Sequence, residues 1–340
     1  MVRIGLIGAG NISETHARAA QAIPGTQIVA VHGANHSRAA RLATICGATP
    51  YAELSAFLRH PMDFVIIGSP TGLHAEQGIA AANHGLHVLV EKPIDTTAAR
   101  ADALIEVARH AGVKLGVLFQ DRAQPSLVHL QDALAAGRLG RPLIAAARVR
   151  WYRPPAYYRD SRWRGTWALD GGGAVMNQGI HTVDLLLWLL GPVRRVSAMT
   201  ATQLHSIEVE DTAVAWIEFA NGAVATYEAT TAAYPGYRRR VELSTTEGTI
   251  VLEHDRVVAA DTREPYDEPV AEPAADANAS ASSPVISDCR GHQRLIEDFI
   301  AAITSDRRPR CTGDDGRRSV AVTEAIYESA RSGRIVEVSA

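Results

Sequence analysis

The first 120 residues alternate short apolar segments with alanine-rich segments of helical spacing, and this alternation limits the possible fold more than any other feature. The apolar segments are rich in β-branched residues and have no polar face, which is typical of strands buried on both sides. Such strands, separated by helices, form a parallel, doubly wound α/β sheet. We predict strands over residues 2–7, 28–31, 64–67, 87–90 and 115–119, and helices over 13–22, 37–45, 74–84 and 97–110.

The pattern changes after residue 122, so we predict a first domain over 1–122 and a second over 123–340. Alternating segments indicate a large open, mostly antiparallel sheet, and Asn221-Gly222 is typical of a hairpin turn. The expected strands are 143–151, 195–204, 212–219, 222–232, 239–246 and 249–254, and the expected helices are 125–136, 174–190, 291–304 and 314–331.

The segment 261–284 is rich in alanine, proline and acidic residues, which favours a solvated, mobile loop. A lid over a site is the alternative interpretation of the same segment.

Composition excludes several classes of protein. A net charge of −3 gives no basic surface for nucleic acid or an anionic membrane. No apolar run reaches the ~20 residues of a membrane helix. Three widely spaced cysteines, Cys46, Cys289 and Cys311, indicate neither a disulfide framework nor a zinc site, so we expect a cytoplasmic protein without a metal.

A glycine-rich turn follows the first strand and opens the first helix. Gly8 and Gly10 permit a tight turn and a close approach of the backbone to a pyrophosphate. The backbone N–H groups of Asn11 and Ile12 would then face the anion at the helix N-terminus. We predict dinucleotide binding here; a glycine-rich turn without a ligand is the alternative.

The end of the second strand carries no acidic residue that could bind the ribose 2′-hydroxyl of NAD. Ser37 and Arg38 stand where they could bind a 2′-phosphate instead. The sequence thus favours NADP over NAD, unless Arg38 is only a solvated surface charge.

Two further segments follow predicted strands at their carboxyl ends, where open α/β sheets bind ligands. After the third predicted strand come Ser69, Thr71 and His74. His74 lies either near the cofactor or on the surface at the start of a helix; the sequence does not separate these alternatives.

Glu91-Lys92-Pro93 follows the fourth predicted strand. Only two of the 34 basic residues are lysines, Lys92 and Lys114, so a lysine here suggests a role that arginine cannot fill. Pro93 restricts the backbone of Lys92, and the ammonium group could stabilise a developing alkoxide. An exposed lysine at a strand end is the alternative.

A second cluster of polar residues follows Gly171-Gly172-Gly173, which would allow a backbone or a ligand to come close. In a helix, Asn177 and His181 share one face, and Asp184 can orient the His181 imidazole. His181 suits proton transfer near neutral pH, although a lone histidine in an apolar helix is often structural.

Together these residues resemble the Gfo/Idh/MocA oxidoreductases, which include glucose–fructose oxidoreductase and inositol dehydrogenases. The resemblance spans almost the whole chain. It rests on GLIGAGNIS at 5–13, EKP at 91–93, FQDR at 119–122, WRGTWALDGGG at 163–173, MNQGIHTVD at 176–184, IEDFI at 296–300 and AIYESA at 325–330.

The resemblance implies a Rossmann domain, an open-sheet domain and hydride transfer between a nicotinamide and a carbohydrate or polyol. It implies catalytic roles for Lys92 and His181, and adds Glu91 and Gln120 to the expected cofactor contacts. Asn177 replaces an aspartate that is frequent in the family, and a neutral amide accepts no proton. The motif with asparagine looks like the branch that acts on pyranoses and sugar nucleotides.

A second departure from the family pattern is Asp121, which stands where asparagine is common. This puts the local cofactor contact in doubt.

The aromatic, arginine-rich loop supplies candidates for substrate binding; the alternative is a structural loop or an oligomer contact. The candidates are Arg122, Tyr157, Arg162 and Trp163. The family also implies a homodimer or homotetramer formed through the second sheet.

We therefore expect an NAD(P)-dependent dehydrogenase of a pyranose or cyclic polyol, with catalytic Lys92, His181 and Asn177. All three are also expected to contact the substrate, and Lys92 the cofactor as well. A non-catalytic dinucleotide-binding sensor on the same fold and a reductase of a non-sugar carbonyl are the rival hypotheses.

Overall fold

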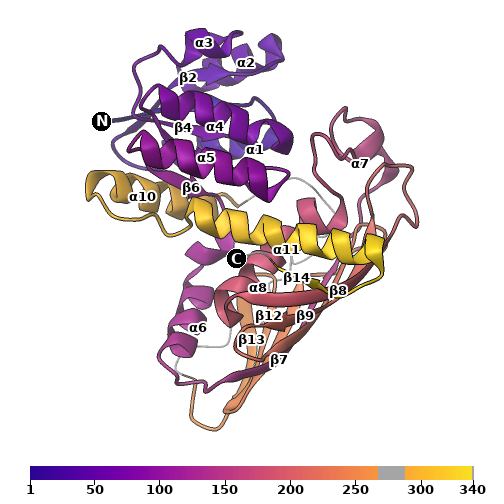
Figure 1. The fold of residues 1–340 in the computed structure, drawn as a ribbon. Helices are drawn as coiled ribbons and strands as arrows, with labels where there is room; N and C mark the ends of the chain where they lie inside the picture. The colour runs from indigo at the N-terminus through magenta and orange to yellow at the C-terminus, as the bar shows by residue number, and fades with distance from the viewer. Residues whose placement is uncertain (267–287, 339–340) are drawn as a thin grey trace. The chain divides into compact units, whose positions relative to one another are not determined.

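The computed structural model describes residues 1–266 and 288–338, and Figure 1 shows their ribbon. The described residues fall into two compact units. Unit 1 is Met1–Gln120 with the described part of Ile286–Arg317, and unit 2 is the described part of Asp121–Val285 and Arg318–Ala340. Within the described chain, no helix combines the length and the apolar character needed to cross a membrane.

Unit 1 contains a six-stranded parallel sheet in the order β3-β2-β1-β4-β5-β6. All four residues of β4 are buried, as the continuous apolar segment predicts. The doubly wound parallel sheet is thus confirmed. Its strands are β1 (Val2–Ile7), β2 (Thr26–His32), β3 (Thr49–Tyr51), β4 (Phe64–Ile67), β5 (His87–Val90) and β6 (Leu115–Val117).

Among the described residues, six α-helices lie wholly in unit 1. Asn35 caps the second and Thr97 the fifth, each accepting a hydrogen bond from a backbone N–H in the first turn. The fourth and fifth pack side by side (Figure 1). The helices are α1 (Asn11–Gln21), α2 (His36–Cys46), α3 (Leu54–Phe57), α4 (His74–Asn83), α5 (Ala98–His110) and α10 (Arg290–Thr304).

Helix α10 lies far along the chain and yet belongs to unit 1, where it packs against α1. Its Phe299 side chain is 1% exposed and meets Phe64 of β4 edge-on, with ring centroids 5.4 Å apart. A Cβ atom on Gly116 would lie 3.0 Å from Phe299, so the glycine makes room for the ring. The expected single boundary at residue 122 therefore differs from this division, because the apolar face of α10 is buried in unit 1.

Unit 2 contains an eight-stranded sheet in the order β13-β12-β11-β7-β10-β9-β8-β14. Neighbouring strands are antiparallel except β7 and β10, which are parallel. The mostly antiparallel sheet is confirmed. Its strands are β7 (Pro142–Arg150), β8 (Val193–Ala201), β9 (Thr212–Phe219), β10 (Val224–Thr230), β11 (Arg240–Thr245), β12 (Gly248–Glu253), β13 (Arg256–Thr262) and β14 (Val336–Glu337).

Of the described helices, α6 (Pro125–Ala135), α7 (Pro155–Arg159) and α8 (Ile180–Leu190) belong to unit 2, and α11 (Gly313–Ser332) has residues in both units. The predicted helix over 174–190 is only partly right. Ala174–Gly179 forms a π-helical segment that leads into α8. A π segment has more residues per turn than an α-helix, and such segments are frequent at functional sites.

The predicted loop over 261–284 begins too early, since Asp261 and Thr262 pair with β12 as the end of β13. Only Val257 of β13 is buried, so this strand carries no alternating pattern that predicts it from sequence. Residues 267–284 of that predicted loop lie outside the described residues.

The buried Glu210 carboxylate anchors the triglycine turn of unit 2. It accepts hydrogen bonds from the backbone N–H of Gly173 at 3.0 Å and of Val175 at 2.8 Å, and from the Tyr327 hydroxyl at 3.0 Å. A Cβ on Gly173 would lie 1.7 Å from the Glu210 carbonyl oxygen, and one on Gly172 would lie 2.1 Å from the Tyr327 hydroxyl. The close approach that these glycines permit is thus made by the chain itself.

We predict that Phe299→Ala lowers the free energy of unfolding by about 3–5 kcal/mol, because it empties a buried aromatic site. Urea denaturation followed by circular dichroism measures this value. The exposed control Ile45→Ala should change it by less than about 0.5 kcal/mol. Equal effects of the two substitutions would contradict the packing of α10 in unit 1.

We also predict that Glu210 makes stability depend on pH. Burial raises the pKa of Glu210 from its usual 4.5 to about 7. The folded state therefore binds a proton that the unfolded state releases, and the free energy of unfolding should fall by about 3 kcal/mol as pH rises from about 4.5 to about 7. Urea denaturation at pH 5 and pH 8 should show this loss in the wild type and not in Glu210→Gln. The exposed control Glu208→Gln should behave as the wild type; a pH dependence unchanged in Glu210→Gln would refute the assignment.

Candidate active site

The glycine-rich turn of unit 1 lies where β1 and β4 end side by side. Gly8 has a φ of 109°, and a Cβ there would lie 2.6 Å from the carbonyl oxygen of Gly68. Helix α1 begins at Asn11 after Gly10, and no side chain of the described residues caps it. A Cβ on Gly10 would meet no described atom within 4 Å. The backbone at Gly10, Asn11 and Ile12 thus offers an open, positively polarised site that fits a pyrophosphate.

The second predicted cofactor segment opens α2 at the end of β2. Asn35 caps this helix by accepting a hydrogen bond from the Arg38 backbone N–H at 3.0 Å. Ser37 and Arg38 stand in the first turn and are both exposed. Their side chains are therefore accessible to a ligand at the carboxyl edge of the sheet.

The third segment connects β4 to α4. The Ser69 hydroxyl donates to the Gln77 side-chain oxygen at 2.6 Å, and Thr71 is buried in a short 3-10 turn. His74 opens α4 and is 1% exposed. The alternative of a surface His74 is therefore wrong; this ring is an internal residue at the sheet edge.

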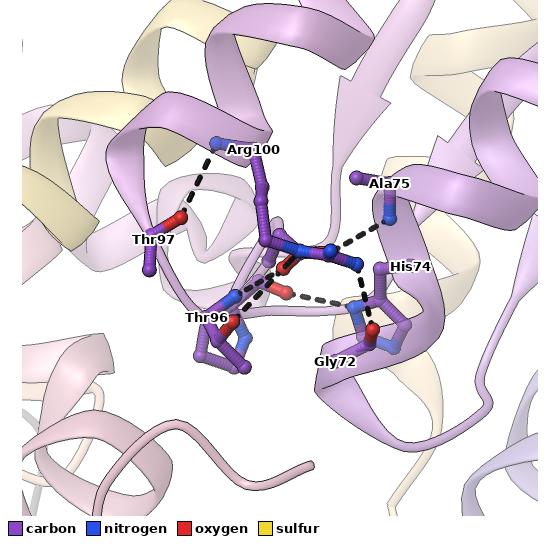
Figure 2. Close-up of polar contacts among 8 residues, drawn as sticks. Gly72, His74, Ala75, Thr96, Thr97 and Arg100 are labelled. Atoms are coloured by element: carbon purple, nitrogen blue, oxygen red, sulfur yellow. Dashed lines mark hydrogen bonds and ion pairs between the residues drawn. The ribbon is translucent and has the colours of Figure 1, made fainter. Parts of the chain in front are cut away.

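A buried carboxylate ties this segment to the one that follows β5 (Figure 2). Asp95 is fully buried and accepts from the Ala75 backbone N–H at 2.8 Å, the Thr96 backbone N–H at 2.6 Å and Arg100 Nε at 2.6 Å. Arg100 also donates to the Gly72 carbonyl at 2.8 Å. The Asp95 carboxylate thus connects the first turn of α4 to the first turn of α5.

Lys92 follows β5, and its neighbour Glu91 is held by two histidines. Glu91 Oε1 lies 2.8 Å from His16 Nε2 and 3.6 Å from His292 Nε2. Burial raises the pKa of Glu91, but hydrogen bonds and charge from these histidines lower it by more, so it lies well below its usual range. Burial lowers the pKa of His16. Glu91 Oε2 accepts from the Lys92 backbone N–H at 3.1 Å.

The same three side chains offer ligand atoms within 4.8 Å of one another. The 2.8 Å separation of His16 Nε2 and Glu91 Oε1 is nevertheless a hydrogen-bond distance. Histidines that bind metals donate their other N–H to an acceptor, whereas Nδ1 of His16 and of His292 has no partner among the described residues. The geometry is that of a hydrogen-bonded cluster.

In unit 2, Asn177 lies in the π segment and His181 in the first turn of α8. The amide nitrogen of Asn177 donates to the buried carboxylate of Asp170, and its amide oxygen accepts from Gln178 Nε2 at 3.2 Å. Asp170 also accepts from the Gly165 backbone N–H at 2.8 Å. Sequence reasoning missed Asp170, although it stands directly before the triglycine turn.

The Asp184 carboxylate accepts two hydrogen bonds from Arg122, at 2.7 and 2.8 Å, and one from the Ser319 hydroxyl at 3.1 Å. That it also orients His181 stays a prediction. Arg122 is 5% exposed, so its guanidinium serves this internal ion pair. Asp121 pairs with Arg239. Burial raises the pKa of Asp121, but the charges of Arg239 and His181 lower it by more. Asp121, which belongs to the FQDR motif, is thus a carboxylate that acts electrostatically with His181.

Tyr157 is the centre of the aromatic, arginine-rich loop. The Arg164 guanidinium lies 4.1 Å from its ring centroid, and Gln178 donates to its hydroxyl at 3.0 Å. Arg164 also lies over Trp163, with 5.3 Å to the ring centroid. Arg162 is exposed. The arginine that joins the two aromatic candidates is therefore Arg164, which was missed because spacing alone does not tell which of two nearby arginines faces a ring.

Arg153, two residues before α7, also approaches the Tyr157 ring. It is 2% exposed, donates to Gln178 Oε1 at 3.0 Å and lies 5.6 Å from the Tyr157 ring centroid. Burial lowers the pKa of Arg153, and burial raises the pKa of Tyr157. Gln178 thus connects Asn177 to the aromatic loop, which brings these parts of the predicted site together.

The comparisons with known proteins agree with this architecture. Residues 2–119 match the family described as an oxidoreductase family with an NAD-binding Rossmann fold, and residues 127–251 match the GFO/IDH/MocA C-terminal domain. The chain is 28% identical to 1,5-anhydro-D-fructose reductase of Ensifer adhaerens and 27% identical to inositol 2-dehydrogenase of Rhizobium meliloti, with 99% of each chain covered in both cases.

A solved structure is similar over the whole chain. The WlbA dehydrogenase from Bordetella pertussis, in complex with NADH and UDP-GlcNAcA, is 33% identical with a TM-score of 0.91, covering 100% of this chain and 98% of that one. The chain therefore belongs to the GFO/IDH/MocA family of oxidoreductases, whose N-terminal domain is an NAD-binding Rossmann fold.

Proposed function

We propose that this chain is a dehydrogenase that transfers hydride between NAD(P) and the carbinol carbon of a pyranose, a pyranose derivative or a cyclic polyol. The names of its relatives support this class of substrate: they include inositol and levoglucosan dehydrogenases and a dehydrogenase crystallised with a UDP-sugar. The cofactor fits the open backbone at Gly10 described above.

The observation that carries the proposal is the way Lys92 is held. It stands at the carboxyl end of β5, directly between Glu91, which His16 and His292 hold, and Pro93, whose carbonyl oxygen lies 2.8 Å from His74. A lysine fixed on both sides at the ligand-binding edge of a Rossmann sheet suits a chemical role better than a solvated charge does.

In this proposal each polar side chain has one task. The nicotinamide, when bound, accepts or supplies the hydride. Lys92 donates a hydrogen bond to the reacting oxygen and stabilises its negative charge. His181 accepts the hydroxyl proton, and the nearby charge of Asp121 favours the imidazolium so formed. Asn177, oriented by Asp170, positions the hydroxyl but takes no proton.

The aromatic, arginine-rich loop provides the substrate contacts. We propose that Tyr157 and Trp163 present rings to the C–H surface of the sugar, and that Arg164 supplies a positive charge for an anionic substituent. The exposed Arg162 remains a candidate for the same role, while Arg122 is used by Asp184.

We further propose that the chain prefers NADP. The end of β2 carries no carboxylate, and Ser37 and Arg38 are both exposed in the first turn of α2, where a 2′-phosphate would lie. Ser69, Thr71, Glu91 and Gln120 complete the proposed cofactor contacts.

A homodimer or homotetramer through the sheet of unit 2 is part of the proposal. Met199 of β8 pairs with Val214 of β9 on the face away from the core, and they are 79% and 54% exposed; Ile144 of β7 is 51% exposed. Exposed apolar residues on paired strands favour association. We place the enzyme in the cytoplasm, as its cysteine pattern suggests.

We predict that Lys92→Ala and His181→Ala each lower kcat by at least about 10²-fold, because each removes a charge or proton transfer needed in the transition state. The dissociation constant for the dinucleotide should change by less than about threefold. Steady-state kinetics with a panel of sugars and polyols, and fluorescence titration with NAD(P)H, measure the two quantities.

Lys114→Ala is the matched control, since the only other lysine is paired with Asp306 at 2.6 Å. Wild-type turnover in Lys92→Ala or His181→Ala would remove that residue from the proposal. Tight dinucleotide binding by the wild type, without turnover of any sugar or polyol, would favour the non-catalytic sensor instead.

We predict that Arg38→Gln raises KM for NADP about tenfold and leaves KM for NAD unchanged, because a charge-assisted contact to the 2′-phosphate is lost. The control Arg41→Gln, one turn further along α2 and paired with Glu14, should affect neither. An unchanged ratio of the two KM values in Arg38→Gln would show that Arg38 is a solvated charge.

A further inference from the structure

The buried His74 ring lies between two backbone carbonyl groups. Its Nδ1 is 2.8 Å from the Pro93 oxygen and its Nε2 is 2.9 Å from the Ser69 oxygen. Figure 2 shows the ring at the start of α4, near Thr96 and Arg100, which both donate to Asp95. Both ring nitrogens of one internal side chain therefore face acceptors that cannot donate.

Two acceptors require two N–H donors. A neutral imidazole carries one N–H, whereas the imidazolium carries two. Both contacts are hydrogen bonds only in the charged ring; in the neutral ring one nitrogen lone pair faces a carbonyl oxygen. The protonation state of His74 thus decides whether one or both carbonyl groups are bound.

Burial and the polar groups around His74 act in opposite directions on its pKa. Burial lowers the pKa of His74, while the two carbonyl contacts and the carboxylates of Asp95 and Glu91 raise it; the net direction is downward. His16 lies close enough for mutual repulsion, and Arg100 is paired with Asp95. The second hydrogen bond is therefore present at acidic pH and is lost as pH rises through this lowered pKa.

The two carbonyl groups belong to the two segments that the proposed function uses. Pro93 directly follows Lys92, and Ser69 begins the segment that continues through Thr71 towards α4. On the other side of Lys92, Glu91 is fixed by His16. The His74 ring thus connects the segments that follow β4 and β5, and Arg100 connects the same two segments through Gly72 and Asp95.

We propose that His74 is a positioning residue that joins the Lys92–Pro93 turn to the Ser69–Thr71 cofactor segment, so that the lysine and the dinucleotide are placed by one ring. The proposal rests on the proposed function only in that Lys92 is taken as catalytic. The two hydrogen bonds of His74, one to Pro93 and one to Ser69, are tested separately from that function.

A pair of amide substitutions separates the two bonds. The side-chain nitrogen of His74→Asn reaches the Nδ1 position, so this variant keeps the bond to Pro93 and loses the bond to Ser69. The nitrogen of His74→Gln reaches the Nε2 position and keeps only the bond to Ser69. Matched controls are His84→Asn and His84→Gln, since His84 is exposed at the end of the same helix.

We expect a split between binding and turnover at acidic pH, below the lowered pKa of His74, where the charged ring makes both bonds. His74→Asn should raise the dissociation constant for the dinucleotide about tenfold and change kcat by less than about threefold. His74→Gln should leave the dissociation constant within about threefold and lower kcat about 10- to 100-fold, because a displaced catalytic group loses rate steeply. A wild-type inflection in the pH profile of one of these quantities should be missing in both variants, since an amide does not titrate.

The two lysines provide a readout that needs no turnover. The rate of acylation of Lys92 relative to Lys114, followed by mass spectrometry, should change in His74→Gln and stay as in the wild type in His74→Asn. Suppose that the acylation rate changes in this way and the variants show the binding split, while the wild type turns over no sugar or polyol. That outcome would refute the proposed function and leave the positioning role of His74 standing.

Two outcomes would overturn the role of His74. One is that both variants alter kcat and dinucleotide binding equally, or act only by lowering the melting temperature. The other needs no variant: a side-chain ¹⁵N NMR titration in which the His74 ring of the wild type stays neutral down to the pH of unfolding would exclude the two-carbonyl bridge.

Discussion

The parallel pairing of β1 with β4 and of β4 with β5 is the constraint on which the site of unit 1 depends. Parallel strands end at the same edge of a sheet, so the turns after them meet there whatever their separation along the chain. The turns after β1 and β4 come so close together that a Cβ on Gly8 would lie 2.6 Å from the Gly68 carbonyl oxygen. The open backbone at Gly10 and the position of Lys92 follow from the same edge.

Buried charges then fix the details of that edge. A carboxylate away from water is stable only with donors around it, and each one here is surrounded by a specific set. Examples are Glu91 and Asp95 in unit 1, and Asp121, Asp170, Asp184 and Glu210 in unit 2. The hydrogen bonds around each carboxylate fix the backbone segments that supply the donors. This makes the turn at Lys92 and the π segment at Asn177 rigid.

The comparison of expectation with structure separates local from distant signals. The strand at residues 64–67, the glycine turn and the lysine at a strand end follow from neighbouring residues, and they were found. The partners of Glu91 and Asp121 were not, because His16 lies 75 residues before Glu91 and Arg239 lies 118 residues after Asp121. The π segment was missed because the spacing of apolar residues does not distinguish an α-helix, with 3.6 residues per turn, from a π-helix with more residues per turn.

The sequence by itself determined the doubly wound sheet, the open antiparallel sheet, the family and the candidate positions Gly10, Lys92 and His181, since all of these rest on periodicity and short motifs. Only the tertiary structure decided that α10 completes unit 1, that Arg122 serves Asp184, and that His74 bridges Ser69 and Pro93. The physical reason is that burial and hydrogen-bond partners depend on contacts between distant segments, and no local pattern encodes which donor meets which acceptor.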